Sequence, residues 1–205
     1  METIKIRVEG KVPLLMHSNQ MANPLNVYSR AIKPLTGKRK KTDADHLEIS
    51  RIEWEAGLYF DDNGNVSIPA EVIEATLRNA ARKTKNGKLI EEGVRVEENF
   101  CKLEYPNNGY KRKVAPSSSD MVPSKELDKM YEKHCDCRLA KVKGSGGTVL
   151  RTRPRFDKWA FEFTLMFDEN IISQRTLLEV VGVAGERIGL CDYRPRYGLF
   201  NSKVV

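Results

Sequence analysis

Hydrophobic and polar residues alternate in two segments that lie far apart along the chain. In IKIRVEGKVPLLM, residues 4–16, aliphatic side chains occupy positions 4, 6, 8, 12 and 14, and charged ones occupy positions 5, 7, 9 and 11. In KWAFEFTLMF, residues 158–167, large apolar side chains recur at alternate positions from Trp159 to Phe167. A period of two is that of a strand with one buried face. The pattern predicts a strand at each segment, and FNSKVV at residues 200–205 is predicted to be a closing strand.

Three segments instead repeat their apolar residues every three or four positions, which is the period of a helix. Each also carries signals at its ends. A helix at about 43–56 follows a capping-box pattern of Thr42 and Asp45. A second helix begins near Pro69 and stops before Gly87, and a third begins after Ser173 and ends at Gly185. The sequence therefore predicts three amphipathic helices.

The remaining segments are short or irregular. Residues 17–41 contain two prolines and no clear period, which favours a long basic loop, and Asn63-Gly64 predicts a hairpin turn. VRVEENFCKLEY, residues 94–105, is strand-like. Residues 106–150 lack apolar periodicity apart from one short helical piece at 124–134, so they are interpreted as an insertion and not as a second core.

The order of these elements predicts an α+β fold. It is compatible with a ferredoxin-like (RRM-like) β-α-β-β-α-β unit, in which an antiparallel sheet carries its helices on one face. The expected organisation is a single domain over residues 1–205 with loop insertions, of which 106–150 is the largest.

Composition adds a preference for a negatively charged partner. The chain of 205 residues has 35 Lys and Arg against 28 Asp and Glu, a net charge of +7. No run approaches the roughly 18 apolar residues of a membrane span, and METIKIRVEG does not resemble a signal peptide. We therefore expect a cytoplasmic protein without a membrane partner, whose four cysteines are reduced.

The stretch AGERIGLCDYRPRYGLF, residues 184–200, is the strongest candidate binding segment. Its glycines would allow backbone amides close to a phosphate, its arginines would supply charge, and its tyrosines would stack on bases. The candidate residues are Gly185, Arg187, Gly189, Tyr193, Arg194, Arg196, Tyr197 and Gly198. The alternative is a structural turn with solvated arginines.

Two further groups of basic residues could contact phosphates. RTRPRF places Arg151, Arg153 and Arg155 at alternate positions, so an extended strand would project all three from one side. The alternative for this row is a charged strand edge that prevents aggregation. The run Lys38, Arg39, Lys40 and Lys41 is either a further contact or a solvated loop.

Other chemistries receive little support from the sequence. A helix precedes the glycines of 185–198, which excludes a dinucleotide loop, and TGKRKKT lacks the spacing of a Walker loop. HCDC at 134–137 has no further cysteine or histidine pair at zinc spacing. The sequence predicts no metal site, no cofactor and no catalytic residue, although His17 and His46 leave acid-base chemistry open.

Three stretches resemble the RAMP superfamily, the RRM-like proteins of CRISPR systems. They are KVPLLMHS, VSIPAEVIEATLRNAAR and the terminal AGERIGLCDYRPRYGLF, which is similar to the glycine-rich loop of that superfamily. VSIPAEVIEATLRNAAR resembles the hairpin-to-helix junction of the subunits that polymerise along a guide RNA. The resemblance implies that a nucleic-acid strand lies along the sheet face, that Arg78 and Arg82 contact it, and that 106–150 forms a thumb.

Three functions follow as hypotheses. The first is a noncatalytic single-stranded nucleic-acid-binding protein, for RNA in preference to DNA, that assembles with copies of itself or related RAMP subunits. The second is a metal-independent endoribonuclease of the repeat-processing RAMP type, using His46 or His17. The third is a protein-interaction module that presents the same basic face to an acidic protein.

Overall fold

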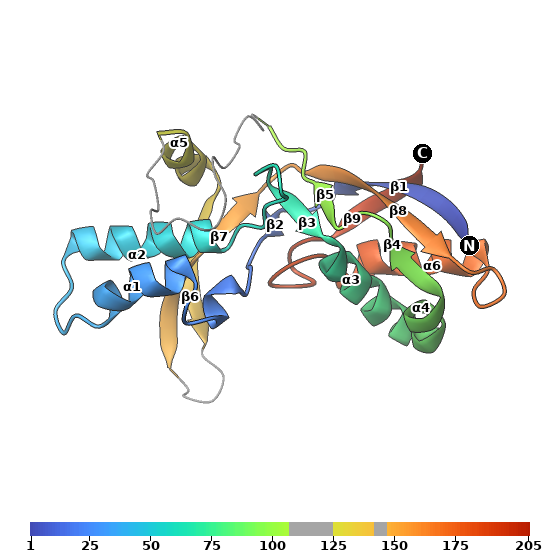
Figure 1. The fold of residues 1–205 in the computed structure, drawn as a ribbon, viewed down its shortest axis with the longest axis horizontal. Coiled ribbons are helices and arrows are strands. Elements are labelled where there is room, and N and C mark those ends of the chain that lie inside the picture. Colours follow the sequence, from blue (N-terminus) through green and yellow to red (C-terminus); the bar gives the residue numbers. More distant parts are fainter. Residues whose placement is uncertain (107–124, 142–146) are drawn as a thin grey trace. The chain divides into compact units, whose positions relative to one another are not determined.

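The structure, a computed structural model, describes residues 1–106, 125–141 and 147–205 (Figure 1). It is α+β with antiparallel sheets, as predicted, and these residues include six α-helices. The chain forms two compact units: unit 1 is Met1–Leu15, Tyr59–Arg112 and Phe156–Val205, and unit 2 is Met16–Leu58 and Lys113–Arg155. The organisation as one domain with an insertion at 106–150 stays a prediction, and 107–124 and 142–146 lie outside the described residues.

Unit 1 is built on a four-stranded sheet. Its strands are β1 (Glu2–Gly10), β4 (Val94–Val96), β8 (Ala160–Phe167) and β9 (Phe200–Val204). They lie in the order β4-β8-β1-β9, and every neighbouring pair is antiparallel. The strands predicted at the beginning, in the last third and at the end of the chain are therefore present, and the last two both pair with β1. The first strand is shorter than predicted, because it ends at Gly10 and does not continue to residue 16.

One face of this sheet is buried, and its register explains the period of two. Ile6 lies opposite Phe163 and Val8 opposite Phe161, and these four side chains are almost inaccessible to solvent. Helices α3 (Ala70–Lys83) and α6 (Gln174–Val183) lie on one side of the sheet in Figure 1. Their buried side chains, which complete the core, are Ile73, Leu77, Ala80, Ala81, Leu177, Val180 and Val181.

The predicted helix cap and hairpin turn of unit 1 are present. The Ser173 side chain accepts a hydrogen bond from the Thr176 backbone N–H and so caps α6. Gly64 has a φ of 75°, and the Asp61 carboxylate accepts the N–H of Asn63 and Asn65 across the turn. The smaller elements of unit 1 are β2 (Leu14–Leu15), β3 (Ser67–Pro69), β5 (Phe100–Lys102) and α4 (Gly87–Gly93), and β3 pairs with β5.

Unit 2 contains a helix that the sequence pattern did not predict. Residues 17–41 were expected to form a loop, but they contain α1 (Val27–Thr36) and the short turn η1 (Gln20–Ala22). Asn26 caps α1 by accepting the Tyr28 backbone N–H, and Pro34 lies inside the helix. The prolines hid the helix, whereas its apolar spacing, Val27 to Ala31 to Leu35, was the signal that could have found it.

The other elements of unit 2 are α2, α5 and the hairpin of β6 and β7. α2 (Asp43–Ala56) packs on α1 around buried Tyr28, Ile52 and Ala56. α5 (Lys125–Lys133), β6 (Cys135–Lys141) and β7 (Thr148–Phe156) come from the predicted insertion. On α2, buried Trp54 donates its Nε1–H to the His134 carbonyl and lies edge-on to Tyr131, so the insertion contributes to a core.

Two buried carboxylates on α2 are paired, as their burial requires. Glu55 accepts the Tyr28 hydroxyl hydrogen bond at 3.0 Å. Glu53 accepts the Thr152 backbone N–H at 3.0 Å and forms an ion pair with Arg151. The sequence pattern does not distinguish these acids, because they look like ordinary solvent-facing helix residues.

The N-terminus of α2 holds the connection from α1. Thr42 and Asp45 form the predicted capping box, and Lys38 Nζ contacts Asp45 Oδ1 at 2.5 Å. The Lys38 ammonium and the Thr42 backbone N–H lower the pKa of Asp45 to about 2. None of the helices in the described residues is long and apolar enough to span a membrane.

The lowered pKa makes a pH-dependent prediction. The pKa of Asp45 is lower in the folded chain than in the unfolded chain, so its stabilising effect is present above about pH 4 and is lost as the pH falls toward 2. We expect Asp45→Asn to be less stable than the wild type at neutral pH and to approach it over this window, measured by urea unfolding. Asp43→Asn is the control, and an equal loss there would contradict the assignment.

Candidate nucleic-acid interface

The predicted binding loop of unit 1 has an unusual backbone. It follows a π-helical turn, Ala184–Ile188, and leads into β9. Besides Gly189 (φ 78°) and Gly198 (φ 75°), Cys191 (φ 60°) and Tyr193 (φ 55°) lie in the left-handed region. Residues with a side chain occupy this region only when the surrounding structure imposes it, and such strain gathers at functional sites. We call residues 189–199 the C-terminal loop.

Hydrogen bonds to the N-terminal segment of unit 1 fix the C-terminal loop. The Gly198 N–H donates to the Pro13 carbonyl and the Asp192 N–H to the Leu15 carbonyl, each at 2.9 Å. Within the loop, the Leu190 N–H donates to the Gly198 carbonyl at 2.9 Å. The loop is therefore an ordered extension of the sheet and not a free connection.

The glycines serve this packing and do not expose amides. A Cβ on Gly198 would lie 2.1 Å from the Leu190 carbonyl oxygen, and one on Gly185 would lie 2.4 Å from the Phe200 carbonyl oxygen. The N–H groups of Gly189 and Gly198 donate to protein carbonyls. These amides are not available to a phosphate in this conformation. Of the phosphate-binding groups expected from the sequence, the arginine side chains remain.

Three arginines of this region are exposed. They are Arg187 on the π-helical turn and Arg194 and Arg196 on the C-terminal loop. Among the described residues, none of the three forms a hydrogen bond or an ion pair through its side chain. A guanidinium without a protein partner can bind a phosphate bidentately without first breaking an ion pair.

The two predicted stacking residues contact each other. The rings of Tyr193 and Tyr197 have centroids 6.5 Å apart and planes at 86°, and the Tyr197 N–H donates to the Tyr193 carbonyl. Both side chains are half-buried. Because the rings are perpendicular, one flat base can lie parallel to only one of them.

The arginine row of unit 2 is largely engaged within the protein. β7 is extended, as predicted, but Arg151 pairs with Glu53, Arg155 lies 3.7 Å from Asp136, and Arg153 is buried with an exposed fraction of 7%. The geometry favours a structural role for this row.

The other cations that the sequence singled out fall into two groups. Arg78 and Arg82 both lie 3.5 Å from the Glu91 carboxylate. Lys38 pairs with Asp45 of α2, and Lys41 donates to the Lys38 carbonyl. Arg39 and Lys40 are exposed, and their side chains have no partner among the described residues.

The open face of the unit 1 sheet is neutralised by its own ion pairs. Arg7 contacts Glu9, Glu104 and Glu162, which raises the pKa of its guanidinium, while Lys5 pairs with Glu162. The outward residues of β1 and β8 include no aromatic side chain. This face therefore lacks the stacking platform that RRM proteins use. No local pattern in the sequence indicates the ion pairs of Arg7 and Lys5.

Nucleophilic and metal-binding groups do not gather in the described residues. Burial raises the pKa of the Cys191 and Cys101 thiols to about 12, so both are protonated at neutral pH. No three His, Cys, Asp or Glu side chains of this part of the chain are placed to hold a metal ion. His46 is exposed in the first turns of α2.

Positive charge is divided unequally between the two units. Unit 2 holds 17 of the 35 Lys and Arg residues but only 10 of the 28 Asp and Glu residues. Unit 1 holds 18 of each. The whole net charge of +7 therefore belongs to unit 2.

Comparison of the chain with known proteins identifies no family. The chain matches no family model, and no curated protein matches it in sequence. The function must therefore be argued from the residues themselves.

The close backbone contacts of the C-terminal loop predict how glycine substitutions behave. Gly198→Ala should lower the free energy of unfolding by about 1–3 kcal/mol, because a Cβ would meet the Leu190 carbonyl at a φ of 75°. Gly182→Ala is the control. No atom lies within 4 Å of its new Cβ, and the substitution in α6 should stabilise the chain by about 0.5–1 kcal/mol. Equal effects of the two in urea unfolding would contradict this account of the loop.

Proposed function

We propose that this chain is a noncatalytic protein that binds single-stranded nucleic acid, with RNA as the favoured strand. The observation that carries the proposal is the set of three exposed arginines, Arg187, Arg194 and Arg196, on and beside a loop whose backbone is fixed. Because the loop backbone is already fixed, only the arginine side chains lose conformational freedom when they bind a phosphate. The half-buried tyrosines beside them offer apolar ring surface to a base.

The proposal includes a ferredoxin-like fold for unit 1, of the RAMP type. In chain order, the sheet strands and the two helices on its buried face are β1, α3, β4, β8, α6 and β9. This β-α-β-β-α-β order, together with the sheet order β4-β8-β1-β9, supports a split βαβ unit. In this interpretation the C-terminal loop takes the position of the glycine-rich loop of the RAMP superfamily.

The proposed contact differs from that of an RRM protein. The strand would be held at the C-terminal loop, since the open sheet face carries paired charges and no aromatic residue on β1 and β8. Arginine contacts to phosphates carry no base code. Binding should therefore depend strongly on salt and weakly on sequence.

The arginine pair provides the direct test. Arg194→Ala with Arg196→Ala should weaken oligonucleotide binding by about 1.5–3 kcal/mol per charge-assisted contact, while the melting temperature stays nearly unchanged because neither guanidinium pairs with the described part of the protein. The measurement is fluorescence anisotropy with a labelled single strand.

Lys83→Ala with Lys88→Ala removes the same charge from exposed positions of unit 1 and serves as the control. Binding that falls equally in both double variants would show a net-charge effect without a site. Cleavage of the labelled RNA in EDTA would contradict the noncatalytic assignment.

Assembly along the strand is part of the proposal. A monomer with different surfaces at its two ends can form a heterologous contact that repeats along a template. Sedimentation with oligonucleotides of increasing length should show stepwise growth of the complex, with copies of this chain added one at a time. A one-to-one complex at every length would exclude templated assembly.

A further inference from the structure

The excess positive charge of unit 2 is concentrated in one segment. Residues 27–41 contain six Lys and Arg and no Asp or Glu. From this segment we infer that unit 2 carries a second nucleic-acid contact, a surface for the phosphate backbone formed by Arg30, Lys33, Arg39 and Lys40. We call these four residues the α1 basic face. The inference rests on the proposed function and extends it beyond the C-terminal loop.

Helix geometry places the first two cations together. Arg30 and Lys33 are three residues apart on α1, so their side chains are neighbours on its surface. Both are exposed, whereas Tyr28 and Ile32 on the opposite side of α1 pack into the core of unit 2. The basic side of α1 therefore faces solvent because the apolar side is fixed by packing.

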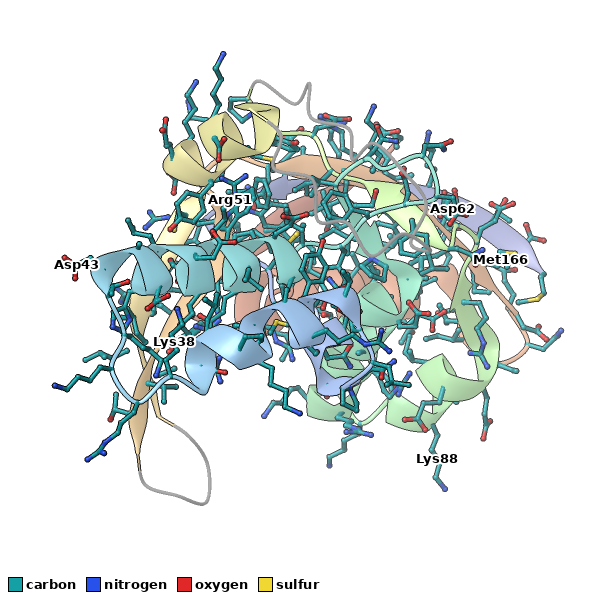
Figure 2. The ribbon with its side chains drawn as sticks, turned by 60° about the vertical axis from the view of Figure 1, so that its left-hand side comes forward. Lys38, Asp43, Arg51, Asp62, Lys88 and Met166 are labelled. Carbon is teal, nitrogen blue, oxygen red and sulfur yellow. The ribbon has the colours of Figure 1, made fainter. Side chains whose placement is uncertain are left out.

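Four further cations follow α1 in the connection to α2. Two of them bond to protein groups, and the other two have no side-chain partner among the described residues. Lys38 pairs with Asp45 at 2.5 Å, and Lys41 Nζ donates to the Lys38 carbonyl at 3.0 Å. Figure 2 shows Lys38 in the connection that precedes Asp43, the first residue of α2. Arg39 and Lys40 lie between these two anchors, exposed and held by the backbone on both sides.

The α1 basic face differs from the paired arginines of unit 2 in having no partner within the described residues. Arg51, Arg138 and Arg151 form ion pairs with Asp128, Asp136 and Glu53 respectively. In the same part of the chain, the side chains of Arg30, Lys33, Arg39 and Lys40 form no hydrogen bond or ion pair. The three arginines are therefore engaged within the protein, whereas the side chains of the α1 basic face are available to a ligand.

The chemistry of the face favours phosphates over bases. The only aromatic residue between 27 and 41 is Tyr28, which is fully buried and bonded to Glu55. No ring on this segment can stack on a base, so its contacts are with the charged backbone alone. The C-terminal loop of unit 1 has tyrosines beside its arginines, so it is the contact at which bases would stack.

Salt dependence provides the experiment. The dissociation constant of the full chain for a labelled single-stranded oligonucleotide is measured from low to moderate salt. Each phosphate neutralised on a single strand contributes about 0.7 to the slope of log K against log salt. Replacing Arg30, Lys33, Arg39 and Lys40 by Ala should lower this slope by about 3, with an unchanged melting temperature.

A matched variant distinguishes the effect of where the charges lie from the effect of lowering the net charge of the chain. Lys83, Lys85, Lys88 and Lys102 are exposed lysines of the neutral unit 1, and their replacement by Ala removes the same four charges. The slope should fall by less than about 1 in this control. An abasic strand of the same length should show the same loss of slope in the α1 variant as the normal strand, because only phosphates are contacted.

The outcomes separate this inference from the proposed function. If the wild type binds the oligonucleotide and the α1 variant keeps its full slope, the second contact is refuted and the proposed function stands. If the wild type binds no oligonucleotide, the proposed function fails and this inference falls with it. If poly-glutamate binds as tightly as the oligonucleotide and the α1 variant loses both equally, the face fits an acidic protein and the phosphate assignment is overturned.

Discussion

The pairing of β1 on both of its edges is the interaction on which unit 1 depends. β8 hydrogen-bonds along one edge of β1 and β9 along the other, so the first residues of the chain organise its last third. The same segment continues past the sheet, where the carbonyls of Pro13 and Leu15 accept N–H groups from the C-terminal loop. The shape of that loop, including two side-chain-bearing residues with positive φ, is imposed by this template.

A second constraint, the pairing of charges, decides which cations are available to a partner. Arg151 on β7 is a candidate binding residue in the sequence, and Arg7 lies on the open sheet face, yet both form ion pairs within their own units. The solvent-accessible ion pairs of Arg7 add little stability, whereas Arg151 compensates the buried carboxylate of Glu53. Their consequence is functional, since a paired guanidinium must give up a carboxylate before it can hold a phosphate. The exposed arginines of the C-terminal loop face no such cost.

Sequence patterns predicted local structure well where a single period or cap decided it. The alternation in β1 and β8, the capping box of Thr42 and the cap at Ser173 all appear as expected, because each depends on residues within a few positions. Helix α1 was missed because Pro34 suggested a loop. A proline late in a helix removes one backbone hydrogen bond, and α1 is nevertheless held against α2 by the buried cluster around Tyr28.

The sequence by itself determined the α+β class, the period of each main strand, the helix caps and the excess of positive charge. Only the tertiary structure decided what the glycines and arginines do. Gly198 is glycine because the Leu190 carbonyl lies where a Cβ would be, a contact that no local pattern reveals. Arg153 and Arg194 are the same residue type, but one is buried beside β6 and the other is exposed on the C-terminal loop. The difference arises from contacts between residues distant in the chain, and those contacts separate structural cations from cations that can bind a partner.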